Sequence, residues 1–125
     1  MRTYLLAASA AVVLAAACTS TGRTIERLIV VNHTVYDVEV LVTSADRDGW
    51  RLLGRVAAGE RAVDEEVEDL GDLWIFRFEH GGEAVGEDLR VERAELEGDE
   101  WTLEVPTEVE DRLRARDVDP SPRQR

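Results

Sequence analysis

A two-residue alternation of apolar and polar side chains constrains the fold of this chain more than any other feature of its sequence. In residues 35–43, apolar side chains occupy every second position from Tyr36 to Val42, and the aromatic residues of segment 73–80 follow the same pattern. Because successive side chains of a strand point to opposite faces, such segments bury one face and expose the other. The pattern predicts strands whose apolar face packs against a second layer.

Similar short segments fill most of the chain, separated by turn signals such as Asp48-Gly49 and Gly81-Gly82. The expected strands are 25–31, 35–43, 50–56, 61–69, 73–80, 84–96 (one long strand or two short ones) and 101–105. About seven short strands at this spacing predict an all-β sandwich or barrel in residues 25–105. Gly54 and a phase change near Arg93 each indicate a β-bulge.

Two segments depart from this rhythm. Residues 61–69 carry many carboxylates between few apolar side chains, which favours an edge strand over the alternative, a single helical turn. After Pro106, the Thr107 and Glu110 spacing and the arginines that follow predict a short helix near 108–116. The proline-containing residues 117–125 are expected to be disordered, so residues 106–125 form a short helix and a tail.

The strand pattern also carries a resemblance. Residues 28–43 with their turn at Asn32, followed by Arg51-Leu52-Leu53-Gly54-Arg55-Val56 and an aromatic strand, resemble a group of small bacterial lipoproteins of unknown function. These proteins carry one immunoglobulin-like sandwich. The resemblance therefore implies a small antiparallel β-sandwich over roughly residues 25–105, and it assigns no catalytic residue.

The amino terminus looks like an export signal. Arg2 precedes the apolar run from Leu5 to Ala17, which has 13 residues. At about 1.5 Å per helical residue, this run is too short for a hydrocarbon core of roughly 30 Å. Small residues at its end suit a signal peptidase, so residues 1–17 are interpreted as a signal peptide.

Cys18, the single cysteine of the chain, follows directly. Leu14-Ala15-Ala16-Ala17-Cys18 resembles the lipobox of bacterial lipoproteins, with Leu one place further from the cysteine than is usual. The resemblance implies cleavage between Ala17 and Cys18, lipid on the cysteine sulfur, and a flexible tether over residues 18–24. It implies a location in the cell envelope, and Thr19 favours the outer membrane facing the periplasm in a cell with two membranes. An ordinary secretory signal with an incidental cysteine and an uncut N-terminal anchor are the two alternatives.

The charge of the chain limits its partners. Its 15 basic residues are all arginine, and all 27 acidic residues follow residue 17, so the chain from Cys18 onward has a formal charge of −13. Such a domain repels phosphate backbones, which excludes nucleic acid as a favoured partner. Acidic side chains between residues 64 and 72 are our candidate contact for a basic protein partner: Asp64, Glu65, Glu66, Glu68, Asp69 and Asp72.

No constellation in the sequence predicts catalysis. The three serines of residues 18–125 lie outside any nucleophile elbow, and an EF-hand that began at Asp46 would place Ala57 where an acidic ligand is needed. His33 and His80 are the only histidines, each expected beside a turn, so no metal ligand and no cofactor are assigned.

The sequence thus predicts a non-catalytic binding or structural module held on a membrane. Two alternatives remain. A carbohydrate or cell-wall binding module would need two exposed, coplanar tryptophans among Trp50, Trp74 and Trp101, although all three are expected to point into the core. An envelope enzyme or metal-binding protein is the other alternative. The oligomeric state is not predicted.

Overall fold

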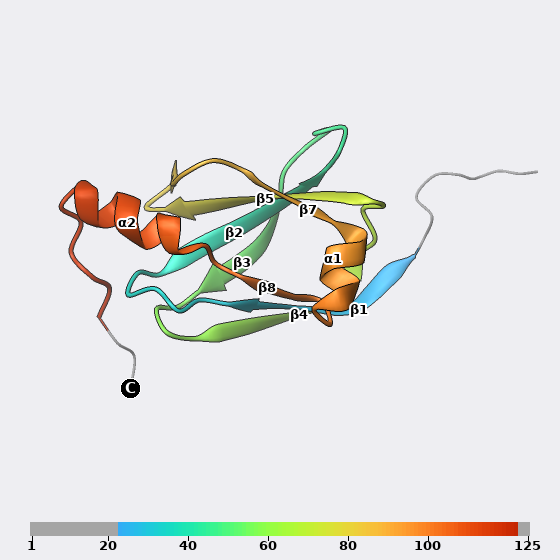
Figure 1. Cartoon of the computed structure of the whole chain (residues 1–125), viewed down its shortest axis with the longest axis horizontal. Coiled ribbons are helices and arrows are strands. Elements are labelled where there is room, and N and C mark those ends of the chain that lie inside the picture. The colour runs from blue at the N-terminus through green and yellow to red at the C-terminus, as the bar shows by residue number, and fades with distance from the viewer. Residues whose placement is uncertain (1–22, 123–125) are drawn as a thin grey trace, which may run out of the picture.

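The computed structural model describes residues 23–122, which form two β-sheets and two short helices (Figure 1). The signal peptide, Cys18 and most of the tether therefore lie outside the described residues, as do residues 123–125. The three-stranded sheet has the order β4 (Arg61–Glu68), β1 (Thr24–Val31) and β8 (Thr102–Glu104). The larger sheet has the order β3 (Arg51–Val56), β2 (Val38–Ser44), β5 (Leu73–His80) and β6 (Glu83–Ala84), with β7 (Leu89–Glu92) also paired to β5. The helices are α1 (Arg93–Gly98) and α2 (Thr107–Ala115).

The alternating segments supply the core between the sheets. Tyr36, Val38, Val40 and Val42 are at most 1% exposed, and the aromatic residues at 74, 76 and 78 of β5 are at most 2% exposed. Strand β1 contributes Leu28 and Val30 from the opposite sheet. The predicted two-layer β-sandwich is confirmed.

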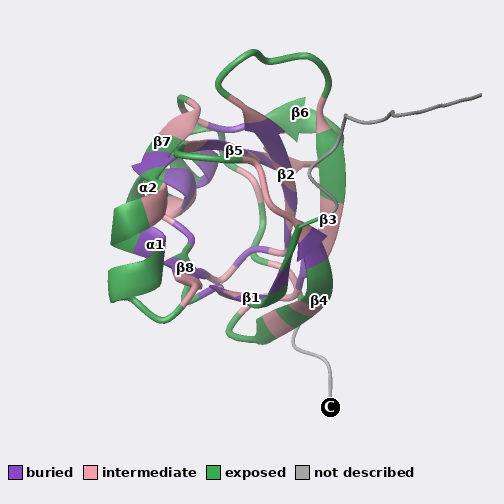
Figure 2. Ribbon diagram, turned by 90° about the vertical axis from the view of Figure 1, so that its right-hand side faces the viewer, coloured by how far each residue is buried: buried purple, intermediate pink, exposed green. Residues whose placement is uncertain are grey.

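The two sides of the sandwich, where the edges of the sheets come together, are closed by different elements, as the view along the strands shows (Figure 2). On one side, β3 and β4 follow each other in the chain and lie next to each other. On the other side, α1 and α2 flank β7 and β8, and each helix buries apolar side chains on the face towards the core. Leu96 of α1, with Val109 and Leu113 of α2, joins the core, so the helices complete it where the strands are short.

Strand pairing is antiparallel with one exception. Strands β1 and β8 run parallel, with Ile29 opposite Thr102 and Val31 opposite Glu104. The sequence predicted an antiparallel sandwich, and a period of two does not report strand direction. The expected bulge at Gly54 is confirmed, because the register between β2 and β3 shifts there and leaves Leu53 as the extra residue.

The bulge expected near Arg93 is wrong. The chain forms α1 at this point, which turns it from the larger sheet to the smaller one. Leu96 points into the core at 2% exposure, so the phase change between Val91 and Leu96 marks a helical turn between two strands. The helix near 108–116 and the edge strand at 61–69 are confirmed as α2 and β4, and β4 does end the order of its sheet.

The turn between β1 and β2 is held by buried hydrogen bonds. Asn32 is fully buried, and its side-chain nitrogen donates to the carbonyl oxygens of Tyr36 and Val56 at 2.8 and 3.0 Å. Its side-chain oxygen accepts from the backbone and the hydroxyl of Thr34. The amide therefore replaces backbone partners that a tight turn leaves without bonds.

The chain after α2 folds back onto this turn, which corrects the expectation of disorder for residues 117–122. The Tyr36 hydroxyl donates to the carbonyl oxygen of Val118 at 2.7 Å. The Ser121 N–H donates to the carbonyl oxygen of Val35 at 2.9 Å, and the Asp37 N–H donates to the Ser121 hydroxyl. Partners 82 to 86 residues away in the sequence supply this order, and local composition does not report them.

Candidate interaction surface

The structure divides the acidic stretch that the sequence singled out. Glu68 forms an ion pair with Arg51, and Asp69 forms one with Arg93. These two carboxylates are neutralised within the domain. Asp64, Glu65, Glu66 and Asp72 form no ion pair with another described residue, so the stretch is not one continuous acidic contact.

Asp69 is the best-held of these carboxylates. Burial would raise its pKa, but the Arg93 guanidinium, the N–H of Gly71 and the charge of Arg23 together hold that pKa below its usual range. Only 8% of its side chain is exposed. Asp69 thus fixes the loop after β4 against the start of α1, which is a structural role.

Asp64 faces inward from the edge strand. It lies opposite the fully buried Leu28 of β1, and burial raises the pKa of its carboxyl. An inward charge on an edge strand is a known device against sheet extension between molecules, because pairing would bury it further. Asp64 is therefore a poor contact for a basic partner.

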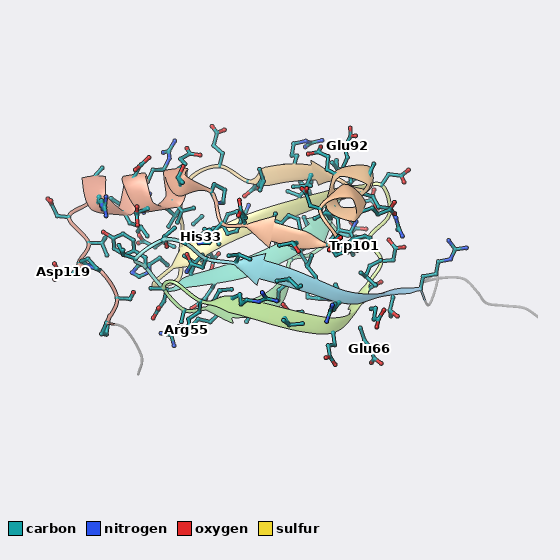
Figure 3. The ribbon with its side chains drawn as sticks, turned by 60° about the horizontal axis from the view of Figure 1, so that its bottom comes forward. His33, Arg55, Glu66, Glu92, Trp101 and Asp119 are labelled. Atoms are coloured by element: carbon teal, nitrogen blue, oxygen red, sulfur yellow. The ribbon has the colours of Figure 1, made fainter. Side chains whose placement is uncertain are left out.

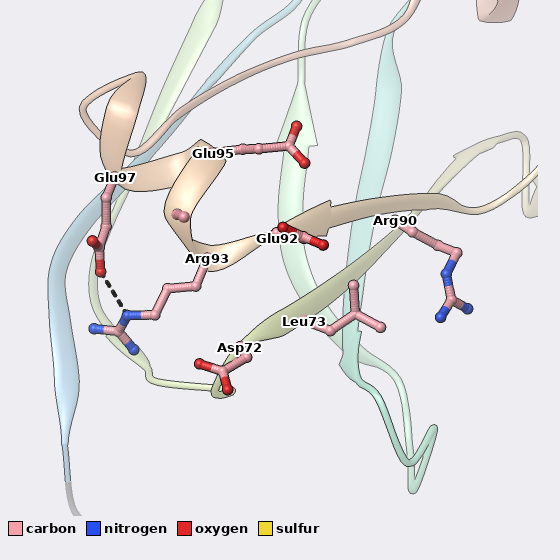
Figure 4. Close-up of a pocket in the computed structure, with 8 residues that line it drawn as sticks. Asp72, Leu73, Arg90, Glu92, Arg93, Glu95 and Glu97 are labelled. Atoms are coloured by element: carbon pink, nitrogen blue, oxygen red, sulfur yellow. Dashed lines mark hydrogen bonds and ion pairs between the residues drawn. The ribbon is translucent and has the colours of Figure 1, made fainter.

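Glu66 lies at the end of the molecule where β1 starts, and Glu92 lies at the same end on the other sheet (Figure 3). An open groove at this end is bordered by the start of β5, the end of β7 and α1 (Figure 4). Its lining residues are Asp72, Leu73, Arg90, Glu92, Arg93, Ala94, Glu95 and Glu97.

The charge of this groove is unbalanced. The Arg93 Nε donates to Glu97 at 2.7 Å, so these two charges largely cancel, while Arg93 also binds Asp69. Asp72, Glu92 and Glu95 have no ion pair with another described residue, and neither has Arg90, so the unpaired groups of the lining keep an excess of negative charge. The groove therefore brings one residue of the predicted contact, Asp72, beside two carboxylates that sequence reasoning missed, because they come from β7 and α1. It suits a positively charged side chain.

A second cluster lies on the outer face of the larger sheet, and sequence reasoning missed it. The Arg77 guanidinium stacks over the Trp50 ring at 4.0 Å from the ring centre and binds Asp88 through two hydrogen bonds of 3.0 and 3.1 Å. Arg47 binds the same carboxylate at 3.1 Å. The hydrogen bond from Arg77 is the largest cause that holds the pKa of Asp88 low. This cluster fastens the 45–50 loop to the sheet.

The three tryptophans occupy different environments. Trp74 is fully buried, and Trp101 packs against it edge-on with 5.5 Å between ring centres, while Arg93 covers Trp101. The inward orientation expected for Trp50 is wrong, since Trp50 is half-buried beneath Arg77, outside the core cluster. Trp74 is thus not available to a sugar, and the two partly exposed rings are each covered by an arginine.

The two histidines contact different residues. His33 pairs with Glu104 at 3.5 Å on an exposed surface, and the Nδ1 of His80 contacts the Asp37 carbonyl oxygen at 2.7 Å. Within residues 23–122, no group of three or more histidine, cysteine or acidic side chains is placed to hold a metal ion. In the same part of the chain, neither helix has the length and apolar character needed to cross a membrane.

Comparison with known proteins yields no relative: the chain matches no family model, no curated protein and no solved structure.

Proposed function

We propose that this chain is a cell-envelope lipoprotein, cut between Ala17 and Cys18, whose small sandwich acts as a non-catalytic binding or structural module. The observation that supports the proposal most is the lipobox-like segment Leu14–Cys18 at the end of a short apolar run. The folded domain starts with Thr24, six residues after the cysteine. At no more than about 3.6 Å per residue, the start of β1 would lie within roughly 20 Å of the lipid.

The charge of the domain fits such an anchor. A surface with a formal charge of −13 is repelled by anionic headgroups, so the lipid would hold the domain at the membrane while its charge keeps it from lying flat. Two or more acyl chains give stable anchoring, whereas a single chain binds marginally. In a cell with two membranes, Thr19 favours the outer membrane as the location.

The intact mass of the protein from the membrane fraction tests this proposal. We expect the mass of residues 18–125 plus two or three acyl chains. Cys18→Ala should remove both the cleavage and the added mass, and Ser20→Ala is the matched control that should keep both. An unmodified Cys18 in a soluble protein would overturn the anchor.

For the partner, we propose a basic protein segment that binds the acidic groove beside α1. The proposal is supported by the three carboxylates without ion pairs, Asp72, Glu92 and Glu95, on the end of the domain that would lie towards the membrane. The groove is open, and its lining combines charged side chains with the apolar Leu73 and Ala94, which suits the charge and the aliphatic stem of an arginine or lysine.

Neutralising the groove tests this contact. In the triple variant Asp72→Asn, Glu92→Gln, Glu95→Gln, basic envelope proteins cross-linked to the wild type should be lost. A control of equal charge change, Glu83→Gln, Glu87→Gln, Asp111→Asn, changes exposed carboxylates elsewhere on the domain and should retain them. If the triple variant retains every partner, the groove is not the contact.

A further inference from the structure

The free edge of β4 carries a self-complementary pattern. Among residues 23–122, β4 has one neighbouring strand in its own sheet, β1, whereas β3, which lies beside β4, belongs to the other sheet. The Asn32 N–H donates to the Glu60 carbonyl oxygen at 2.8 Å, so Glu60 directs its backbone towards β1. Because backbone groups alternate in direction along an antiparallel strand, Arg61, Val63 and Glu65 direct theirs away from β1, to the free edge.

The side chains of these same three residues lie on the outer face of the sheet. Arg61 and Glu65 are exposed and form no ion pair with another described residue, and Val63 is 46% exposed. Val63 and Leu52 are the large apolar residues with the greatest exposure in the described chain. The edge ends at Glu66, whose φ of 53° interrupts the extended backbone.

We propose that two copies of this chain associate through β4, in an antiparallel pair about a two-fold axis at Val63. In this register Val63 lies opposite Val63 of the second copy, and Arg61 lies opposite Glu65 of the second copy. The symmetry repeats the charge pair, so each dimer has two. The outward backbone groups of all three residues meet their counterparts, and the two three-stranded sheets become one continuous sheet.

Charge selects this register over its neighbours. If the two-fold axis moves from Val63 to Asp64, Asp64 lies opposite Asp64 of the second copy. This is an inward position, where burial already raises the pKa of Asp64. A larger shift in the other direction places Arg61 opposite Arg61. In the proposed register, Asp64 lies opposite Ala62, and the like charges that face each other are Glu60 and Glu66, at the point where the φ of Glu66 ends the extended edge.

The apolar contact continues beyond the edge. Ile29 of β1 is the cross-strand neighbour of Val63 and is half-buried on the same outer face. The paired edges would therefore form an apolar strip of Ile29 and Val63 from both copies, flanked by the charge pairs. The small size of this strip, the cost of burying the inward Asp64 of each copy further and the negative charge of both copies predict a weak dimer. The lipid anchor of the proposed function would raise its population by concentration on the membrane, but the pairing itself does not depend on the anchor.

Charge reversal and its repair test the dimer in the full-length Cys18→Ala chain, kept in detergent and measured by sedimentation equilibrium. Arg61→Glu and Glu65→Arg should each weaken association by about tenfold or more, because each reversal sets like charges opposite one another twice per dimer. The double variant Arg61→Glu, Glu65→Arg restores opposite charges and should recover the association of the parent. Circular dichroism confirms that each variant is folded.

A cross-link supplies an independent measurement. In the same Cys18→Ala background, Val63→Cys carries the single thiol and should form a disulfide-linked dimer under mild oxidation. Glu83→Cys, exposed on the other sheet, is the matched control and should remain monomeric. The proposal is overturned if both single charge variants associate as the parent does, if the double variant stays as weak as the singles, or if the two cysteine variants cross-link equally.

Discussion

The two ends of this sandwich are held by different kinds of interaction. At the carboxyl-terminal end, the turn of residues 32–37 is fixed by the fully buried side chain of Asn32 and by the chain after α2. At the amino-terminal end, where β1 starts, the loops are fixed by charge pairs such as Asp69 with Arg93 and Glu68 with Arg51. Figure 3 shows His33 and Asp119 at the first end and Glu66 and Glu92 at the second.

The difference shows how each end responds to its surroundings. When a buried neutral amide is removed, its partners stay buried without a hydrogen bond, and their full desolvation penalty lowers the stability of the fold. Salt does not screen this penalty. A pair with an exposed arginine is screened by salt and contributes little. The carboxyl-terminal end also has a charge pair, Asp37 with Arg55, but its turn is held by the buried amide as well. We therefore expect it to be the more rigid end, and the amino-terminal end to respond more strongly to pH and ionic strength.

Asn32→Ala should produce the largest effect. It leaves the carbonyl oxygens of Tyr36 and Val56 and the Thr34 N–H without their buried partner, so the free energy of unfolding should fall by about 3 kcal/mol or more. Urea unfolding followed by tryptophan fluorescence measures the change. His33→Ala, next in the chain but exposed, should change it by less than about 0.5 kcal/mol. Equal effects of the two variants would refute the role of Asn32.

Tyr36→Phe removes one hydrogen bond from the same end. The hydroxyl that donates to the Val118 carbonyl oxygen is lost while the ring stays in the core, so we expect a loss of about 1 kcal/mol. Hydrogen exchange should also become faster at the Ser121 amide, which is bonded to Val35 next to this site. Unchanged exchange there would mean that the last described residues are held without Tyr36.

Asp69→Asn tests the amino-terminal end and should cost less than about 1 kcal/mol, because the partner Arg93 is partly exposed. The pKa of Asp69 is lowered by folding, so its contribution is present above the unfolded pKa near 4 and is lost as the pH falls through the folded value. The difference between variant and parent should shrink at pH 2 and in 1 M salt. A difference that persists in both conditions would contradict an electrostatic origin.

Asp64→Asn should have the smallest effect, of opposite sign. Burial raises the pKa of Asp64, so its ionised form destabilises the fold above the folded pKa, and this penalty disappears as the pH falls through that value. The variant should be slightly more stable than the parent at pH 7 and equal to it at pH 3. Thermal unfolding at both pH values measures this, and Glu65→Gln on the exposed face is the control that should change neither.

The sequence predicted the sheets better than their connections. Alternation in segments 35–43 and 73–80 predicted β2 and β5, because burial of one face requires that period. The sequence pattern did not predict the helix from Arg93 to Gly98, because its one buried residue, Leu96, is too few to show a helical period. Parallel pairing of β1 with β8 depends on which segments meet in space, and local composition carries no record of that.

The candidate surfaces were less predictable for the same reason. The acidic residues from 64 to 72 were visible in the sequence, but Asp69 is neutralised by Arg93, which is 24 residues away. Trp50 was expected in the core, yet a cation from β5 covers its ring on the outer face. Ion pairs between distant segments decide which charges remain for a partner, and only the fold shows them.

The parallel pairing of the first and last strands also affects how the chain acquires its structure. Ile29 and Thr102 pair although they are 73 residues apart in the sequence, so their contact closes a long loop at a high entropic cost. The smaller sheet stays incomplete until almost the whole chain has emerged from the ribosome. A polypeptide that must wait for its last strand stays unfolded for longer during synthesis, and passage through an export channel, which our proposal for this chain includes, requires an unfolded chain.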